Sequence, residues 1–215
     1  MHSTAGLFGG DQLECSIRVE RGARVRITQQ SATKIHPSED RLAFQRTQVF
    51  VDTGAELQLH LEPIIPFADS QLRQETLLNV EPGGCLSYWE GFMTGRAGRG
   101  ESWQFRELAS ETRLCSGGRL LYLDRFRLVP NGANRSTWTM GNANYTGVGL
   151  HVGEHARSLA SELRAALPEA GIETLADDVA LTRIVSSSGP DFHRSREIFC
   201  RHTAAGGKMP GGVTK

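Results

Sequence analysis

Glycine turns recur at intervals of about thirty residues along the first part of this chain, and each is followed by a short apolar pattern. The turn glycines are Gly22, Gly54, Gly83 and Gly117. Apolar residues stand three and five positions after each of them, namely Val25 and Ile27, Leu57 and Leu59, Leu86 and Tyr88, and Leu120 and Tyr122. A period of two is typical of strands with one buried face, and a repeat of this length is typical of stacked coils. The sequence therefore predicts a mainly β fold with a stacked β-strand, β-helix-like core.

The same alternation predicts polar residues inside that core. Because successive side chains of a strand point to opposite faces, the position seven after each glycine faces the interior. Those positions hold Gln29, Leu61, Glu90 and Asp124. A carboxylate on an apolar face is costly unless it is paired or used. We therefore expect Glu90 and Asp124 to be functional, or to form buried ion pairs with Arg96 or Arg125.

The pattern changes after the β core, which we assign to residues 1–130. Residues 131–149 are rich in Asn, Gly and Thr and are predicted to be a connection. The apolar stripe in 154–167 predicts a helix, 179–185 a strand, and 191–203 a second helix. Residues 150–205 are therefore expected to form a small helix-strand-helix C-terminal part, followed by a glycine-rich mobile tail at 206–215.

The composition excludes several classes of partner. The 215 residues contain 24 Lys and Arg and 24 Asp and Glu, a balance that argues against a nucleic-acid or membrane surface. No apolar run has the length of a membrane span, and the N-terminus lacks a signal pattern, so we expect a cytoplasmic protein. The four cysteines contain no Cys-x-x-Cys pair and are interpreted as reduced, mostly buried thiols.

Two short segments match motifs of known functional sites, but their context argues against both functions. His151 to His155 fits the His-x-x-Glu-His pattern of a class of zinc peptidases, which requires both histidines on one face of a continuous helix. Gly153 and the alternation before it indicate that the helix starts later, leaving the histidines misaligned. The glycine-rich run 94–101 continues into an extended segment rather than a helix, which argues against nucleotide binding. We expect a structural loop in which Arg96 pairs with Glu90 or Glu101.

Five short motifs occur in order between residues 1 and 128. They are His followed by Gly-Gly-Asp at 2–11, Ala-Thr-Lys at 32–34 with Ala-Phe-Gln at 43–45, Gly-Ala-x-Leu at 54–57, Trp-Glu with Gly-Arg and Gly-Glu between 89 and 101, and Asp-Arg at 124–125. In this order the motifs resemble the UreD family of urease accessory proteins, named UreH in some lineages. Members of that family carry a β segment ahead of the first motif. The resemblance thus leaves either a start upstream of Met1 or a shortened form.

The resemblance implies a non-enzymatic role in urease maturation. Family members have a β-helix-like fold and bind urease apoprotein together with UreF, which recruits the GTPase UreG. This assembly delivers nickel to the urease active site. The resemblance therefore implies a nickel-insertion chaperone with no permanently bound cofactor and with nickel(II) in transit, and the balanced charge leaves no nucleic acid and no membrane among the expected partners.

The resemblance also marks individual residues. The family's polar interior is proposed to conduct nickel, and Asp11, Lys34, Glu90 and Asp124 fall on matching positions. Asp11, Glu90 and Asp124 would be transient metal ligands, and Glu62, Arg96 and Glu101 are weaker candidates. Carboxylates bind a divalent first-row metal more weakly than a histidine-thiolate cage would, which suits a relay that must release its ion.

Two other functions remain open from the residues alone. Stacked strands with paired acids also occur in polysaccharide hydrolases and lyases, which would expose Glu90 in a groove lined by aromatic residues such as Trp89 and Trp103. A purely structural adaptor would hold the same acids in inert ion pairs.

Overall fold

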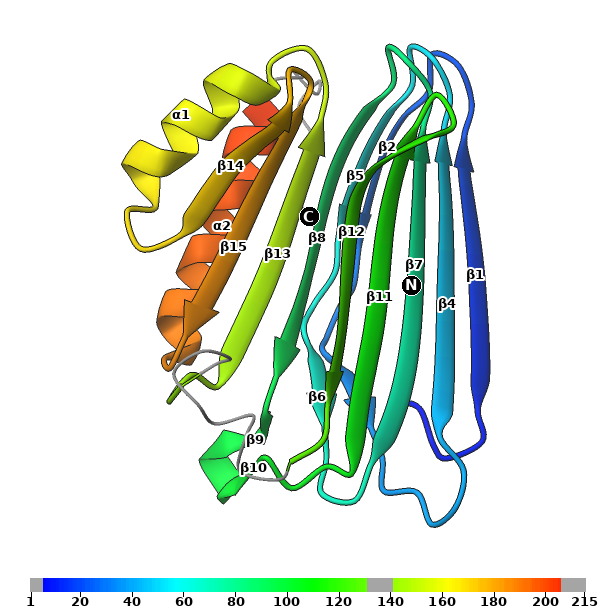
Figure 1. Cartoon of the computed structure of the whole chain (residues 1–215), viewed down its shortest axis with the longest axis vertical. Helices are drawn as coiled ribbons and strands as arrows, with labels where there is room; N and C mark the ends of the chain where they lie inside the picture. The colour runs from blue at the N-terminus through cyan, green and yellow to red at the C-terminus, as the bar shows by residue number, and fades with distance from the viewer. Residues whose placement is uncertain (1–5, 131–140, 206–215) are drawn as a thin grey trace, which may run out of the picture.

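Two β-sheets lie face to face in the computed structural model, which describes residues 6–130 and 141–205 (Figure 1). The five-stranded sheet has the order β1 (Gln12–Val19), β4 (Ala43–Val51), β7 (Gln71–Val80), β11 (Glu107–Ser116) and β12 (Arg119–Leu128). The longest run of the eight-stranded sheet is β14 (Gly171–Ala176), β15 (Val179–Ser186), β13 (Tyr145–Val152), β8 (Cys85–Met93), β5 (Glu56–His60) and β2 (Arg24–Thr28). Its remaining strands, β3 (Thr33–Ile35) and β6 (Ile64–Pro66), pair with each other, and β6 also pairs with β8. The predicted tail 206–215 and residues 131–140 of the predicted connection lie outside the described residues.

Each coil crosses from the five-stranded to the eight-stranded sheet through a glycine turn. The crossings are β1 to β2, β4 to β5 and β7 to β8, and their turn glycines Gly22, Gly54 and Gly83 have φ values of 77°, 72° and 78°. Glycine adopts this left-handed conformation without the steric cost of a Cβ atom. Successive coils pair in parallel, as in β1–β4–β7–β11 and β2–β5–β8. These coils confirm the predicted β-helix-like fold class.

The fourth glycine turn differs from the other three. Gly117 and Gly118, with φ values of 53° and 77°, close a hairpin, so β12 runs antiparallel to β11 within the same sheet. Two consecutive residues with positive φ match the twist of a two-residue hairpin. A register shift at Leu114 and Cys115 then turns Leu120 outward, where it is 51% exposed. The prediction that Leu120 faces the interior is therefore wrong, whereas Tyr122 is buried as expected.

The C-terminal part continues the eight-stranded sheet and covers its outer face. β13 pairs antiparallel with β8 and with β15, and β15 pairs with β14. The helices α1 (Ala156–Ala166) and α2 (Gly189–Ala205) pack on the outer face, where Trp89 contacts Phe192 and Phe199 (Figure 1). The two predicted helices and the strand at 179–185 are present. The structure adds β14, and β13 begins inside the segment 131–149 that was predicted to be a connection.

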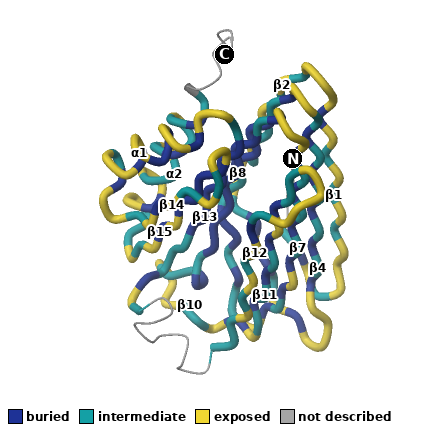
Figure 2. Tube along the Cα trace, turned by 45° about the horizontal axis from the view of Figure 1, so that its top comes forward, coloured by how far each residue is buried: buried dark blue, intermediate teal, exposed yellow. Residues whose placement is uncertain are grey.

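Two apolar clusters fill the space between the sheets. The larger lies next to the glycine turns and includes Val51, Leu57, Leu86 and Leu114. The smaller lies at the opposite ends of the strands and includes Ile35, Leu72, Phe92 and Leu108. Figure 2 shows buried residues concentrated along β8 and exposed ones in the turns. A band of polar side chains separates the two clusters.

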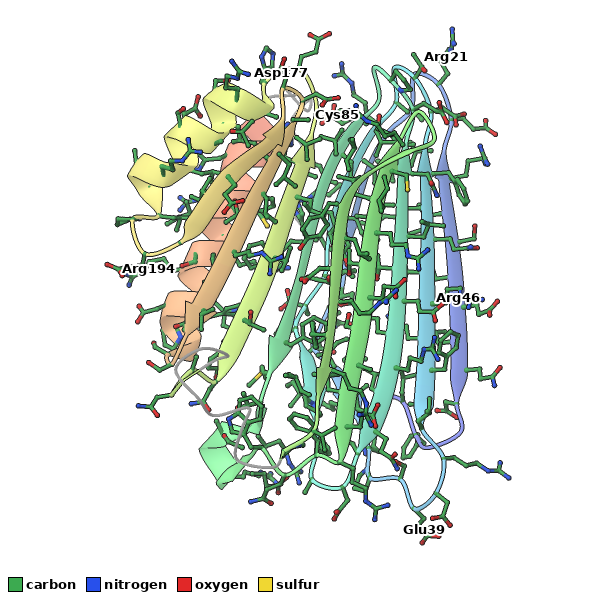
Figure 3. All side chains as sticks on the ribbon, viewed as in Figure 1. Arg21, Glu39, Arg46, Cys85, Asp177 and Arg194 are labelled. Atoms are coloured by element: carbon green, nitrogen blue, oxygen red, sulfur yellow. The ribbon has the colours of Figure 1, made fainter. Side chains whose placement is uncertain are left out.

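Within 6–130 and 141–205, no helix packs on the outer face of the five-stranded sheet, and ion pairs cover this face (Figure 1). Arg46 on β4 donates to Glu75 on β7, with Nη2 and Oε2 2.8 Å apart (Figure 3). Arg125 and Arg127 on β12 pair with Glu111 and Glu107 on β11. Exposed pairs of this kind contribute about 0–1 kcal/mol each. The acids on this face point to solvent and are ion-paired, so they can serve as controls for the acids that point between the sheets.

Candidate functional site

The polar band forms where three parallel strands repeat the same inward polar residues. In register, Gln45, Gln74 and Ser110 form one row. Thr47, Thr76 and Thr112 form the next row, which Asp124 of β12 extends. All six residues of the three parallel strands are at most 7% exposed. We call these six residues, together with Glu90, the polar layer.

Glu90 reaches the polar layer from the opposite sheet. Its Oε2 accepts a hydrogen bond from Nε2 of Gln74, and its Oε1 accepts one from Oγ1 of Thr112, both at 2.8 Å. The residue is 5% exposed. These two neutral donors satisfy both carboxylate oxygens, and Glu90 forms none of the ion pairs found among the described residues. Of the two partners expected for Arg96, Glu101 forms the ion pair and Glu90 does not.

The surroundings of Glu90 favour its neutral form. Burial raises the pKa of the Glu90 carboxyl, and the nearby negative charge of Asp124 raises it further. The hydrogen bonds from Thr112 and Gln74 act in the opposite direction because they stabilise the charged form. A buried carboxyl held by two neutral donors is a group from which a cation could displace a proton.

Asp124 lies at the mouth of a cavity that has Glu90 in its wall. The cavity has a volume of about 300 Å³, and its polar lining includes Glu90, Thr112, Asp124 and Arg183. The Asp124 side chain is 24% exposed, and its Oδ1 lies 3.5 Å from Nη2 of Arg183 on β15. Arg125, the partner considered from the sequence, points outward to Glu111. The structure thus brings Glu90 and Asp124 to one space, which we call the Glu90–Asp124 cavity.

Asp11 and Lys34 lie away from this cavity. Asp11 is exposed just before β1, where its Oδ2 accepts a hydrogen bond from the Phe8 backbone N–H at 2.8 Å. Lys34 is exposed on β3 between the buried residues Thr33 and Ile35. Neither residue lines the Glu90–Asp124 cavity.

The three weaker candidates are all engaged in ion pairs outside the cavity. Glu62 pairs with Arg196 of α2, with Oε1 and Nη2 2.8 Å apart. Arg96 and Glu101 face each other across β9 (Gly95–Arg96) and β10 (Glu101–Ser102), joined by hydrogen bonds of 2.7 and 2.5 Å. The Arg96 guanidinium also lies 4.0 Å from the Phe67 ring centroid. This confirms the predicted structural loop at 94–101.

Sequence reasoning missed the residues that hold and face the two acids. Gln74, Thr112 and Arg183 belong to none of the sequence motifs described above. A signal for the first two was present, because the segments 45–47, 74–76 and 110–112 share a pattern of Gln or Ser, any residue, then Thr. No comparable signal marks Arg183, since its approach to Asp124 depends on how the C-terminal strands join the eight-stranded sheet.

No preformed metal cage accompanies the cavity. Among residues 6–130 and 141–205, no group of three or more His, Cys, Asp or Glu side chains is arranged to hold a metal ion. The His-x-x-Glu-His match does not form a helical pair either, because β13 ends at Val152 and α1 begins at Ala156. Two carboxylates with amide and hydroxyl neighbours make a weak oxygen-donor environment, suited to brief contact with a divalent cation.

The groove expected of a polysaccharide-cleaving enzyme is not formed at the predicted residues. Glu90 is buried between the sheets, and Trp89 is buried under α2. These side chains cannot present an acid beside an aromatic platform to a sugar chain. The structure therefore gives no support to the hydrolase or lyase alternative.

Comparison with known proteins identifies the family. The family model described as UreD urease accessory protein matches residues 1–205. The chain belongs to the UreD urease accessory protein family. It is 33% identical over 183 residues to the urease accessory protein UreD of Cupriavidus necator, covering 82% of this chain and 63% of that relative. It is 29% identical over 202 residues to the UreD of Deinococcus radiodurans, covering 92% of this chain and 73% of that relative.

The match to UreD relatives covers only part of some of them. A third relative, the UreD of Acetivibrio thermocellus, is 34% identical over 134 residues, which cover 62% of this chain and 51% of the relative. The resemblance inferred from the ordered motifs is thus confirmed, and the accessory-protein names agree with a non-catalytic role. Within the described residues of this UreD-family chain, no helix is long and apolar enough to cross a membrane.

Proposed function

We propose that this protein is a urease maturation factor that assists nickel insertion by passing nickel(II) through its polar interior. The observation that carries this proposal is Glu90, a buried acid that forms no ion pair with any residue of the described ranges and lies in the wall of a cavity where Asp124 is partly exposed. An inert structural residue at this position would be expected to be an amide or to have a positively charged partner, because a buried carboxyl with a raised pKa destabilises the folded state at neutral pH. The family membership supplies the urease context.

The chemistry of the polar layer suits transit better than storage. A relay site must attract an ion and release it, which successive single acids achieve better than a closed cage. Glu90 and Asp124 would each offer one carboxylate to the ion. The Gln and Thr oxygens of the polar layer would replace part of its hydration shell.

The partners of this function are part of the proposal. We propose that the chain acts in the cytoplasm in a complex with UreF, with the GTPase UreG through UreF, and with urease apoprotein. In that complex it would serve as a scaffold without catalytic activity of its own. Nickel would be its cargo rather than a resident cofactor.

The test is urease activation in cells that coexpress urease and the full accessory set with variants of this chain. We expect Glu90→Ala and Asp124→Ala to lower nickel incorporation about tenfold or more, because even the loss of a residue that only supports a metal ligand costs about 10–100-fold. The control is Glu75→Ala, which removes an acid from the outer face of β7, next to Gln74 and Thr76. This variant should activate urease normally. Full activation by both cavity variants, with the complex still assembled, would reject the nickel path through these acids.

Asp11 and Lys34 are tested separately because they lie outside the cavity. If they extend the nickel path, Asp11→Ala and Lys34→Ala should lower nickel content while leaving the complex intact. If they instead contact a partner, the same changes should reduce copurification of UreF or urease. Normal activation and normal copurification would remove both residues from the proposed function.

A further inference from the structure

Arg183 lies in register with Glu90 across the strands of the eight-stranded sheet, and it is close to Asp124. On the eight-stranded sheet, Val148 of β13 pairs with Glu90 on one side and with Arg183 on the other. The residues that precede Arg183 on the same face of β15, Val179 and Leu181, belong to the larger apolar cluster. Along this face of β15, Arg183 is therefore the first charged residue after the apolar ones, and it lies next to the polar layer.

The contacts of Arg183 hold it loosely at the cavity mouth. Its Nη2 donates a hydrogen bond to the Tyr122 hydroxyl at 3.1 Å and lies 3.5 Å from Asp124 Oδ1. Its side chain is 49% exposed. A monodentate ion pair at this distance is much weaker than a bidentate pair such as Arg127 with Glu107 on the outer face. The guanidinium can therefore leave Asp124 by giving up one weak contact to the carboxylate and one hydrogen bond to the hydroxyl of the buried Tyr122.

We propose that Arg183 is a tethered cation that occupies Asp124 at the mouth of the cavity until an incoming divalent cation displaces it. This inference rests on the proposed nickel path through Asp124 and Glu90. A guanidinium carries one charge, so a divalent ion competes with it for the carboxylate better than a sodium or potassium ion does. Arg183 thereby lowers the affinity for all cations, excludes monovalent ones, and returns to Asp124 when the metal leaves.

The experiment measures nickel binding directly. Nickel chloride is titrated into the full chain by calorimetry, comparing wild type with Arg183→Gln, Arg183→Lys and Tyr122→Phe. We expect Arg183→Gln to bind nickel about fivefold more tightly, the factor that corresponds to one partly exposed ion pair. Arg183→Lys should stay close to wild type because it retains the charge. Tyr122→Phe, which keeps Arg183 but removes one of its contacts, should give a smaller gain.

A matched control separates this effect from general charge. Arg125→Gln removes an arginine next to Asp124 in sequence whose guanidinium pairs with Glu111 on the outer face. It should leave nickel affinity unchanged. The gain from Arg183→Gln should also shrink as sodium chloride is raised, because salt screens the ion pair that the variant removes.

The outcomes distinguish this inference from the function on which it rests. If nickel binding by wild type is insensitive to Asp124→Asn and Glu90→Gln, the nickel path itself is rejected. If binding depends on those acids but Arg183→Gln and Tyr122→Phe leave it unchanged, the nickel path stands and the role of Arg183 is overturned. Equal tightening by Arg125→Gln would likewise overturn it, because a long-range charge effect would then explain the gain.

Discussion

At the scale of single residues, Glu90 lines the cavity of the proposed nickel path and also destabilises the folded state at neutral pH. Its carboxyl is buried, its pKa is raised, and its two hydrogen-bond donors are neutral. The unfolded chain ionises Glu90 freely above about pH 4.5, whereas the folded chain resists that ionisation. The folded state is therefore disfavoured progressively as the pH rises from that value through the raised pKa.

This cost predicts that Glu90→Gln stabilises the protein at pH 7. The amide keeps the shape of the side chain and has no proton to lose, so we expect a gain in unfolding free energy that grows as the pH rises above about 4.5. Urea unfolding of both proteins at pH 7 measures it, and the gain should vanish near pH 4.5. Glu75→Gln should not stabilise, because hydrogen bonding to Arg46 lowers the pKa of Glu75. A Gln variant less stable than wild type at pH 7 would contradict the expected cost.

At the scale of elements, β13 depends on two glycines that make room for aromatic rings. A Cβ atom on Gly149 would lie 2.5 Å from the Phe199 ring, and one on Gly147 would lie 2.6 Å from the Trp89 ring. The strand can therefore approach α2 only because these positions lack side chains. The alternation ahead of Gly153 indicates a strand, but glycines are also typical of a connection, which is why the start of β13 falls in the segment 131–149 that is predicted to be one.

Accordingly, Gly149→Val should loosen the packing of α2 on the eight-stranded sheet. Overpacking of this kind costs about 1–3 kcal/mol. Thermal unfolding followed by circular dichroism measures the loss. Gly98→Ala is the control, because its Cβ atom would meet no atom within 4 Å. Equal melting temperatures for Gly149→Val and wild type would show that α2 does not pack here as described.

Elements also differ in how far the sequence could predict them. The three crossings after Gly22, Gly54 and Gly83 follow from spacing and alternation alone. The hairpin at Gly117 does not, because a glycine pair suits a crossing as well as a hairpin, and only the pairing partner decides between them. Asp124 was correctly expected to face the interior, yet it does so from the five-stranded sheet, and the register shift in the hairpin sets its direction.

At the scale of the whole molecule, the polar layer is a property of the stack rather than of any strand. Each coil contributes only a Gln or Ser and a Thr, which look unremarkable in isolation. Parallel register aligns them into rows, and the opposite sheet adds Glu90. This is why the two central acids could be predicted from a strand's own alternation, whereas their hydrogen-bond donors could not.

Two buried histidines of the eight-stranded sheet, His60 and His151, should make the whole fold sensitive to acid. Burial, aided by Arg26 and Arg196, lowers the pKa of His60 to about 4. Burial, aided by His155, lowers that of His151 to about 4 as well. As the pH falls from about 6.5 to 4, the unfolded chain binds protons that the folded chain excludes. Each histidine should then remove about 3 kcal/mol of stability.

The measurement is urea unfolding between pH 7.5 and 5, a range above the titration of ordinary carboxyls. Below about pH 6.5 the two histidines should remove stability from the wild type, in opposition to the gain that Glu90 contributes as it becomes protonated. The double variant His60→Gln and His151→Gln should show a flatter profile, even if its stability at pH 7.5 is lower. Parallel profiles for the two proteins would show that these histidines do not govern the pH dependence.

Parallel pairing between coils also dictates the order in which the chain can assemble. Strands such as β1 and β4 meet only after an intervening stretch of about thirty residues has closed, whereas β11 and β12 need only a glycine turn. The hairpin therefore has the lowest contact order in the five-stranded sheet and the smallest entropic cost of nucleation. A refolding chain would grow its coils from the hairpin toward β1, opposite to the direction in which a ribosome releases them.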